Sequence, residues 1–289
     1  MRKTVPCLFV FLAPLLLFAQ HTYSFLNGKG PITWALIEKK VPRSTMINFV
    51  KSLPAEFSVY RTNDQYSPTL NDLYKKLHFI DINGDNNYDV IFEGQSGGEA
   101  REVEIFLFTK KGYVKALEEM EGLSSITFEN GLLKQMVISD WGCCEDYINF
   151  DKTFNVSISK EGYTSFTLVL QTACAFQGTV PDSMFEKPFA FEVLNDAYNL
   201  RSRPVIDNIS YEPWWEADTT IGRGNTLAKL PQGAKGIALG KHTDDTGREW
   251  WYVEIDENVA LLKSVFYGND NKFPTKKRGW ISSRFVKRL

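Results

Sequence analysis

Residues 77–92 read LHFIDINGDNNYDVIF, and this stretch decides how the first half of the chain is interpreted. Two short apolar runs, 77–80 and 90–92, flank a loop in which side chains with oxygen atoms occupy alternate positions. These side chains are Asp81, Asn83, Asp85, Asn87 and Asp89. Three carboxylates so close together repel one another unless a positive charge lies between them. The stretch therefore predicts two β-strands joined by a loop that carries the donor atoms of a cation site.

Calcium is the cation whose preference for about six to eight oxygen ligands suits this loop. An EF-hand is excluded, because it needs Gly at the sixth position and Glu at the twelfth, where this chain has Asn86 and Phe92. The pattern resembles the strand–loop–strand calcium loops of FG-GAP repeats, over the loop and its two strands alone. That resemblance implies a structural calcium ion with a backbone carbonyl ligand from Asn87 and side-chain ligands from Asp81, Asn83, Asp85 and Asp89. The alternative is a polar turn whose side chains accept hydrogen bonds from its own backbone.

Residues 1–19 have the order of a secretory signal peptide. Arg2 and Lys3 form the charged region, an apolar run spans 8–18, and Ala19 precedes the expected cleavage before Gln20. The apolar run is too short for a membrane-spanning helix, so we expect no transmembrane span in the mature chain. A retained anchor is the alternative. The expected location is therefore outside the cytoplasm, in the periplasm or secreted.

The charge balance gives no reason to expect a nucleic-acid partner. Removal of Arg2 and Lys3 from the 33 basic residues leaves 31 against 35 acidic ones, a net charge of −4. A nucleic-acid-binding domain normally shows a basic excess. The basic residues near the end of the chain, from 276 to 288, are more typical of a solvated strand edge.

A chain of 289 residues is long enough for one or two domains. The fold class expected is mainly β. Residues 20–194 are expected to form an antiparallel β-rich domain with two short helices, at 43–53 and 69–77, where apolar residues recur at helical spacing. Alternating apolar residues and turn signals such as Asn130-Gly131 predict the strands. The expected pairs are 102–108 with the chain after the turn at 110–112, 125–129 with 132–138, and 154–158 with 163–170.

Three cysteines follow the expected cleavage site. Cys143 and Cys144 are adjacent and poorly placed to bridge to each other, so the expected disulfide joins Cys174 to Cys143 or to Cys144. Three free thiols are the alternative. A zinc site is not supported, because no C-x-x-C motif or neighbouring histidine is present.

The second part of the chain, 195–289, resembles the bacterial SH3 (SH3b) domain family. The resemblance is carried by NLRSRP at 199–204, GNTLAKLPQG at 224–233 with KGIAL at 235–239, GREWWYVE at 247–254 and RGWISSRF at 278–285. It implies a small SH3-like β-barrel with a cell-wall or peptide ligand. Arg203 departs from the family, which usually has Gly there, and the connections 205–221 and 256–277 are long.

Aromatic residues of this second domain are the candidate ligand contacts. They are Trp214, Trp215, Trp250 and Tyr252. Exposed aromatic side chains suit contact with a sugar or a peptide. For Trp214 and Trp215 the alternative is packing against the first domain.

The sequence thus favours an exported, non-catalytic binding protein whose partner is peptidoglycan or another envelope peptide or protein. The first alternative is a cell-wall hydrolase, or a metal-using hydrolase built on Asp81, Asp85 and Asp89. The cysteine and histidine motifs of cell-wall peptidases are absent, and the three histidines, at positions 21, 78 and 242, lie far apart. The second alternative is a structural or assembly protein that uses its domains as spacers.

Overall fold

The computed structural model describes residues 32–55, 57, 69–95, 101–139, 148–175, 178–179, 181–210, 223–266 and 273–289. The predicted signal peptide, Cys143, Cys144, Trp214 and Trp215 lie outside these residues, so the predictions that rest on them stay predictions.

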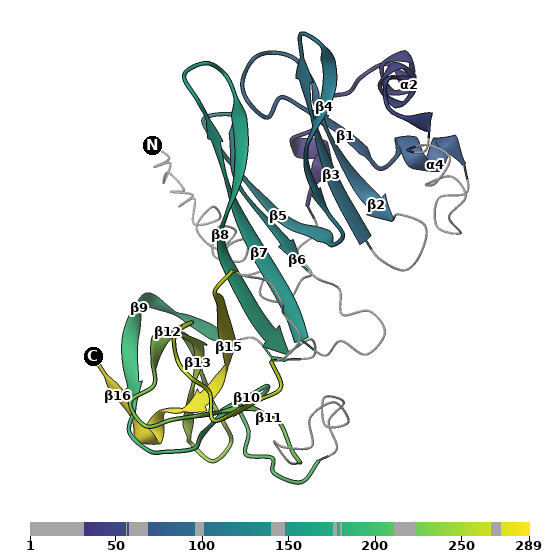
Figure 1. Ribbon diagram of the computed structural model, residues 1–289. Helices are drawn as coiled ribbons and strands as arrows, with labels where there is room; N and C mark the ends of the chain where they lie inside the picture. Colours follow the sequence, from purple (N-terminus) through teal and green to yellow (C-terminus); the bar gives the residue numbers. More distant parts are fainter. Residues whose placement is uncertain are drawn as a thin grey trace, which may run out of the picture.

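The described chain is mainly β, as the sequence predicts, and its sheets are antiparallel apart from one strand pair (Figure 1). The helices are α2 (Arg43–Ser52) and α4 (Leu70–Tyr74), with the 3-10 turns η2 (Trp34–Leu36) and η4 (Ser283–Phe285). The strands of the first half are β1 (Leu77–Ile80), β2 (Asp89–Gln95), β3 (Arg101–Thr109), β4 (Gly112–Glu119), β5 (Gly122–Glu129), β6 (Leu132–Ser139), β7 (Ile148–Ile158) and β8 (Thr164–Ala175). Those of the second half are β9 (Ser183–Val193), β10 (Tyr198–Arg201), β11 (Thr226–Leu230), β12 (Lys235–Thr243), β13 (Glu249–Ile255), β14 (Lys263–Ser264), β15 (Thr275–Ser282) and β16 (Val286–Arg288).

The first sheet has the order β1-β2-β3-β4 and is covered on one face by both helices. Phe49 and Val50 of α2 and Leu73 of α4 pack with Phe79, Phe92 and Phe106 from the strands. Thr69 is the N-cap residue of helix α4. Its hydroxyl oxygen accepts a hydrogen bond from the Asp72 backbone amide at 3.3 Å, the contact that makes threonine a good N-cap. The predicted helices at 43–53 and 69–77 are thus confirmed, the second being shorter than expected.

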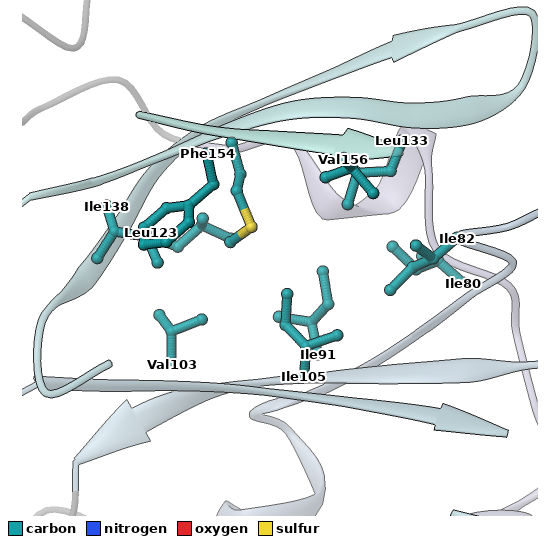
Figure 2. Packing of buried hydrophobic residues seen from close by; sticks show 11 residues of the cluster. Ile80, Ile82, Ile91, Val103, Ile105, Leu123, Leu133, Ile138, Phe154 and Val156 are labelled. Atoms are coloured by element: carbon teal, nitrogen blue, oxygen red, sulfur yellow. The ribbon is translucent and has the colours of Figure 1, made fainter. Parts of the chain in front are cut away.

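The opposite face of the first sheet packs against strands β5 to β8. Figure 2 shows this core, in which Ile91, Val103 and Ile105 of the first sheet face Leu123, Phe154 and Val156 across the gap between the sheets. The predicted hairpin at Asn130-Gly131 joins β5 to β6, and both residues have positive φ, 53° and 78°. Asparagine and glycine tolerate that conformation best, which is why the pair is a strong hairpin signal.

Strands of the second half continue the same sheet as β5 to β8. The hydrogen-bonded order is β16-β9-β12-β13-β15-β8-β7-β6-β5, with β10, β11 and β14 attached to one side at β15. Strand β9, which the sequence placed in the first domain, pairs with β12 and β16 of the second. The pairings of the described strands form an open path and do not close a barrel.

One parallel strand pair joins the two halves, since Gln171, Thr172 and Ala173 of β8 lie opposite Thr275, Lys276 and Lys277 of β15. In Figure 1, β15 runs from the lower group of strands up to β8. Sequence periodicity predicts strands but not which distant strands pair, so this continuity was not expected from the chain.

A row of buried polar residues crosses the sheet at this joint. Asp151 of β7, Cys174 of β8, and Glu254 and Arg278 of β13 and β15 are each less than a tenth exposed. The Nε and Nη2 atoms of Arg278 both donate to Oε2 of Glu254, at 3.0 and 2.8 Å. We call these four residues the buried polar row.

Two cores lie within the second half. The larger is formed by residues of β9 to β13, β15 and their turns, with Trp251 packed on Phe185 and Phe189. The smaller consists of Trp250, Tyr252 and Trp280. No helix in the described part of the chain is long and apolar enough to cross a bilayer.

Candidate functional site

The acidic loop joins β1 to β2 and is ordered by its own side chains. The Asp81 carboxylate accepts backbone amide hydrogen bonds from Gly84 at 2.7 Å, Asp85 at 3.2 Å and Asn86 at 3.0 Å. The Asp85 carboxylate accepts one from Asn87 at 2.8 Å. Two positive φ angles, at Gly84 and Asn86, fold the loop tightly enough for these contacts.

Asp89 closes the loop at its base and is fully buried. Its two carboxylate oxygens accept backbone hydrogen bonds from Ile82 and Phe108, both at 2.9 Å. Burial raises the pKa of Asp89 to about 6, although those two hydrogen bonds lower it, and the charges of Asp85 and Asp81 raise it further. The three carboxylates therefore lie close enough to repel one another.

The donor atoms suit calcium by type, because all of them are oxygens of carboxylates or amides. Their arrangement is that of a polar turn in which the carboxylates accept hydrogen bonds from the loop backbone. The carboxylate oxygens of Asp81, Asp85 and Asp89 do not form a triplet within 4.8 Å of one another. Oδ1 of Asp81 accepts two backbone amides, whereas Oδ2 of Asp81 and both oxygens of Asp89 accept one each and keep a second lone pair for a cation. The side chain of Asn83 is part of this network, with its Oδ1 accepting from the Asp85 amide at 3.0 Å.

A different acidic cluster, which the sequence did not single out, does meet the spacing of a metal site. Glu102, Glu104 and Glu118 of β3 and β4 bring carboxylate oxygens within 4.8 Å of one another. Lys115 lies among them, with its Nζ 2.5 Å from Glu104 and 2.7 Å from Glu118. Glu104 and Glu118 lie directly opposite on neighbouring strands, where like charges destabilise a sheet. The lysine therefore supplies the positive charge that this cluster requires.

A groove with aromatic and basic walls opens on the second half of the chain. It has a volume of about 260 Å³ and lies between β10, the start of β13 and η4. Tyr198, Trp250 and Phe285 supply its rings, and Arg201, Arg248 and Arg284 its charges. We call it the Tyr198 groove.

Hydrogen bonds and ring contacts fix the walls of the Tyr198 groove. The Tyr198 hydroxyl donates to the carbonyl of Ser282 at 2.8 Å, and the ring packs edge-on against Phe285 with centroids 6.2 Å apart. The Trp250 indole donates to Asp244 at 2.9 Å, and the Arg248 guanidinium lies 5.7 Å from the Trp250 ring centroid. The Asp244 carboxylate also accepts the backbone amides of Thr246 and Arg248, so the turn that carries Arg248 is well defined.

The predicted aromatic contacts divide into three groups. Trp250 lies in the lining of the Tyr198 groove, but it is 1% exposed and belongs to the small core, so its ring offers almost no surface to a ligand. Tyr252 is buried in the small core with Trp280, at a ring-centroid distance of 5.3 Å, and is therefore not available to a ligand on the surface. Trp214 and Trp215 lie outside the described residues.

Cys174 is buried and forms no disulfide with a described residue. Burial raises its pKa to about 12, and the Asp151 charge acts in the same direction. The thiol is therefore protonated at neutral pH and is a poor nucleophile. Its predicted partners, Cys143 and Cys144, lie outside the described part of the chain, and the disulfide stays a prediction.

Comparison of this chain with protein-family models, with curated proteins and with solved structures found no match.

Proposed function

We propose that this protein is an exported, non-catalytic binding protein of the bacterial envelope. Residues 195–289 act as an SH3-like domain that recognises a cell-wall peptide or glycan, or an envelope protein. The observation that carries the proposal is the Tyr198 groove, in which aromatic rings and guanidinium groups converge at one open site. Ligand sites typically combine such apolar walls with a few well-placed polar groups.

The four SH3b-like sequence segments support this proposal, because three of them supply the walls of the groove. Segment 199–204 contributes Asn199 and Arg201, segment 247–254 contributes Arg248 and Trp250, and segment 278–285 contributes Arg284 and Phe285. These residues are far apart in the sequence and meet at one place because β10 and β13 both pair with β15.

Retention on purified cell-wall sacculi tests the proposed function. We expect the purified full chain to co-sediment with sacculi without releasing soluble fragments. The Phe285→Ala substitution should reduce retention several-fold, because it removes a ring that is 48% exposed at the groove. The matched control is Tyr163→Ala, which removes a 76% exposed ring from the distant β7–β8 turn and should leave retention unchanged.

The two alternatives give different results in the same experiment. Soluble fragments that depend on Asp85 or on a cysteine would identify a hydrolase and contradict the proposal. If the protein is not retained on the sacculi and releases no fragments, the structural spacer is the alternative that remains.

We propose further that the acidic loop binds a structural calcium ion through Asp81, Asn83, Asp85, Asn87 and Asp89. The support is the repulsion among its three carboxylates, which burial of Asp89 makes stronger. The hydrogen bonds of the loop to its own backbone support the simpler alternative of a polar turn.

Calcium should raise the melting temperature of the full chain if the ion occupies the loop. Extracellular calcium modules have dissociation constants of about 0.1–1 mM, so about 10 mM calcium should stabilise the folded state by about 1.4–2.7 kcal/mol. The Asp85→Asn substitution should abolish the rise, because it removes a charge but keeps an oxygen for the Asn87 amide. The control is Glu161→Gln in the exposed turn between β7 and β8, which should keep the rise. Equal melting temperatures in calcium and in chelator would rule the ion out.

A further inference from the structure

The described lining of the Tyr198 groove contains three arginines and no acidic residue. Buried or crowded positive charges are normally balanced by carboxylates. A groove of this size with no carboxylate in its lining therefore has an excess of positive charge at a site where apolar walls strengthen its field.

Arg201 is fixed in the structure by neutral groups. It is 5% exposed, and its Nη1 donates to the Asp207 carbonyl at 2.8 Å and to the side chain of Asn225 at 2.7 Å, while Nη2 donates to Asn208 at 2.9 Å. Burial lowers the pKa of Arg201, the charges of Asp207 and Tyr198 raise it, and the charge of Arg248 lowers it. Arg201 therefore contributes charge to the floor of the groove but has its terminal nitrogens occupied.

Arg248 and Arg284 remain available for a ligand. The Nε atom of Arg248 is buried and has no hydrogen-bond partner among the described residues. The side chain of Arg284 is exposed on η4, and it forms no ion pair with a described residue. Buried polar atoms without partners are rare in folded proteins and indicate a missing ligand or water.

Tyr198 and the three arginines belong to the lining of the same groove. Burial raises the pKa of this tyrosine, whereas its hydrogen bond to Ser282 and the charges of Arg248, Arg201 and Arg284 lower it.

We propose that the Tyr198 groove binds a carboxylate group of a short peptide, held by Arg248 and Arg284, with the adjoining peptide against Tyr198 and Phe285. This inference rests on the proposed function for the class of ligand and adds the chemical group that is recognised. Arginine matches a planar carboxylate with two parallel hydrogen bonds.

The size and walls of the groove favour a peptide end over a bare anion or a long chain. Its volume of about 260 Å³ is below the range of about 300–1,000 Å³ found for sites that enclose drug-sized ligands. A peptide terminus or one acidic side chain fits such a volume. The rings of Tyr198 and Phe285 suit the apolar atoms that flank such a carboxylate, and inorganic phosphate offers none.

The test is an NMR titration of the full chain that follows the indole resonance of Trp250 and the backbone amides of Tyr198 and Arg284. Three peptides are compared: acetyl-trialanine, its C-terminal amide, and acetyl-Ala-Glu-Ala amide. We expect the peptides with a carboxylate to bind at least about tenfold more tightly than the trialanine amide, because hydrogen bonds to a charged group are stronger than those between neutral groups. Tighter binding of acetyl-trialanine would identify the ligand group as a chain terminus, and tighter binding of acetyl-Ala-Glu-Ala amide would identify it as an acidic side chain.

Charge-removing variants complete the test. Arg248→Gln and Arg284→Gln should each weaken carboxylate binding about tenfold, and Lys287→Gln, which removes an exposed charge from β16, should leave it unchanged. Equal binding of acid and amide would overturn the inference, as would equally strong competition by inorganic phosphate. Retention on sacculi that persists in the Arg248→Gln/Arg284→Gln double variant would preserve the proposed function and overturn the inference alone. Binding of carboxylate peptides without retention on sacculi would support the inference and overturn the proposed function.

Discussion

Replacement of Arg278 by methionine is expected to lower the free energy of unfolding by about 3–5 kcal/mol, because it leaves the buried Glu254 carboxylate without its main partner. The two residues lie directly opposite each other on β13 and β15 and form two hydrogen bonds. Burial alone would raise the pKa of Glu254, but the charge of Arg278 and its hydrogen bonds hold the pKa below the usual value. Urea unfolding at neutral pH measures the loss.

Lys276→Met is the matched control for this experiment. Lys276 contacts the same carboxylate at 3.0 Å, but its side chain is 29% exposed. Partly exposed ion pairs of this kind contribute about 1 kcal/mol or less. The double variant Arg278→Met/Glu254→Met should lose less than Arg278→Met alone, since it removes both buried charges together. A loss below about 1 kcal/mol for Arg278→Met would mean that water reaches Glu254.

Asp151→Asn is expected to stabilise the protein at neutral pH and to have little effect in acid. Burial raises the pKa of Asp151 to about 6, although its hydrogen bond from Ser139 and the charge of Arg278 lower it. The folded state therefore keeps a proton that the unfolded chain has already released above about pH 4. Stability falls as the pH rises from about 4 to about 6, by a total of about 3 kcal/mol, and stays at that lower value above pH 6.

The asparagine variant lacks this titration, so its advantage over the native chain should appear between about pH 4 and pH 6 and then stay constant. Its side-chain oxygen can still accept the hydrogen bond that Ser139 donates at 2.5 Å. If the new amide group at position 151 lacked a hydrogen-bond partner, the free energy of unfolding of the variant would fall by the same amount at every pH, and its dependence on pH would not change. Asp245→Asn, at an exposed turn position, is the control and should follow the native curve. A parallel pH dependence for the Asp151→Asn variant and the native chain would show that Asp151 does not cause the loss of stability in this pH range.

Local features of the fold were predictable from the sequence, because short-range signals determine them. Asn130-Gly131 gave the β5–β6 turn, and the alternation in residues 102–108 gave β3. The spacing of Asp81, Asp85 and Asp89 predicted a loop between two strands, which is what the structure contains. Binding of a cation by that loop depends on the exact positions of its oxygen atoms, and the spacing of residues in the sequence does not determine those positions.

Features that depend on distant pairing were not predictable. The parallel contact of β8 with β15 and the transfer of β9 to the second half arise from contacts between segments far apart in the chain. The same reason explains why the sequence selected Tyr252, which is buried, and overlooked Arg248 and Arg284. These arginines occur in the quoted SH3b-like segments, but their significance appears only when β10, β13 and η4 bring them to one groove.

The parallel pairing also bears on how the chain is made. Strands β15 and β16 are synthesised last, yet they complete the ladders of β8, β13 and β9. Domains near the N-terminus usually fold first, while the rest of the chain is still being made at about 5–20 residues per second. Here the edge of β8 at 171–173 stays uncovered until residues 275–277 have emerged, and an uncovered strand edge is a template for aggregation. The hundred or so residues that separate the two strands therefore set how long a nascent chain carries an unpaired edge on β8, an interval in which delayed folding or a chaperone would lower the risk of aggregation.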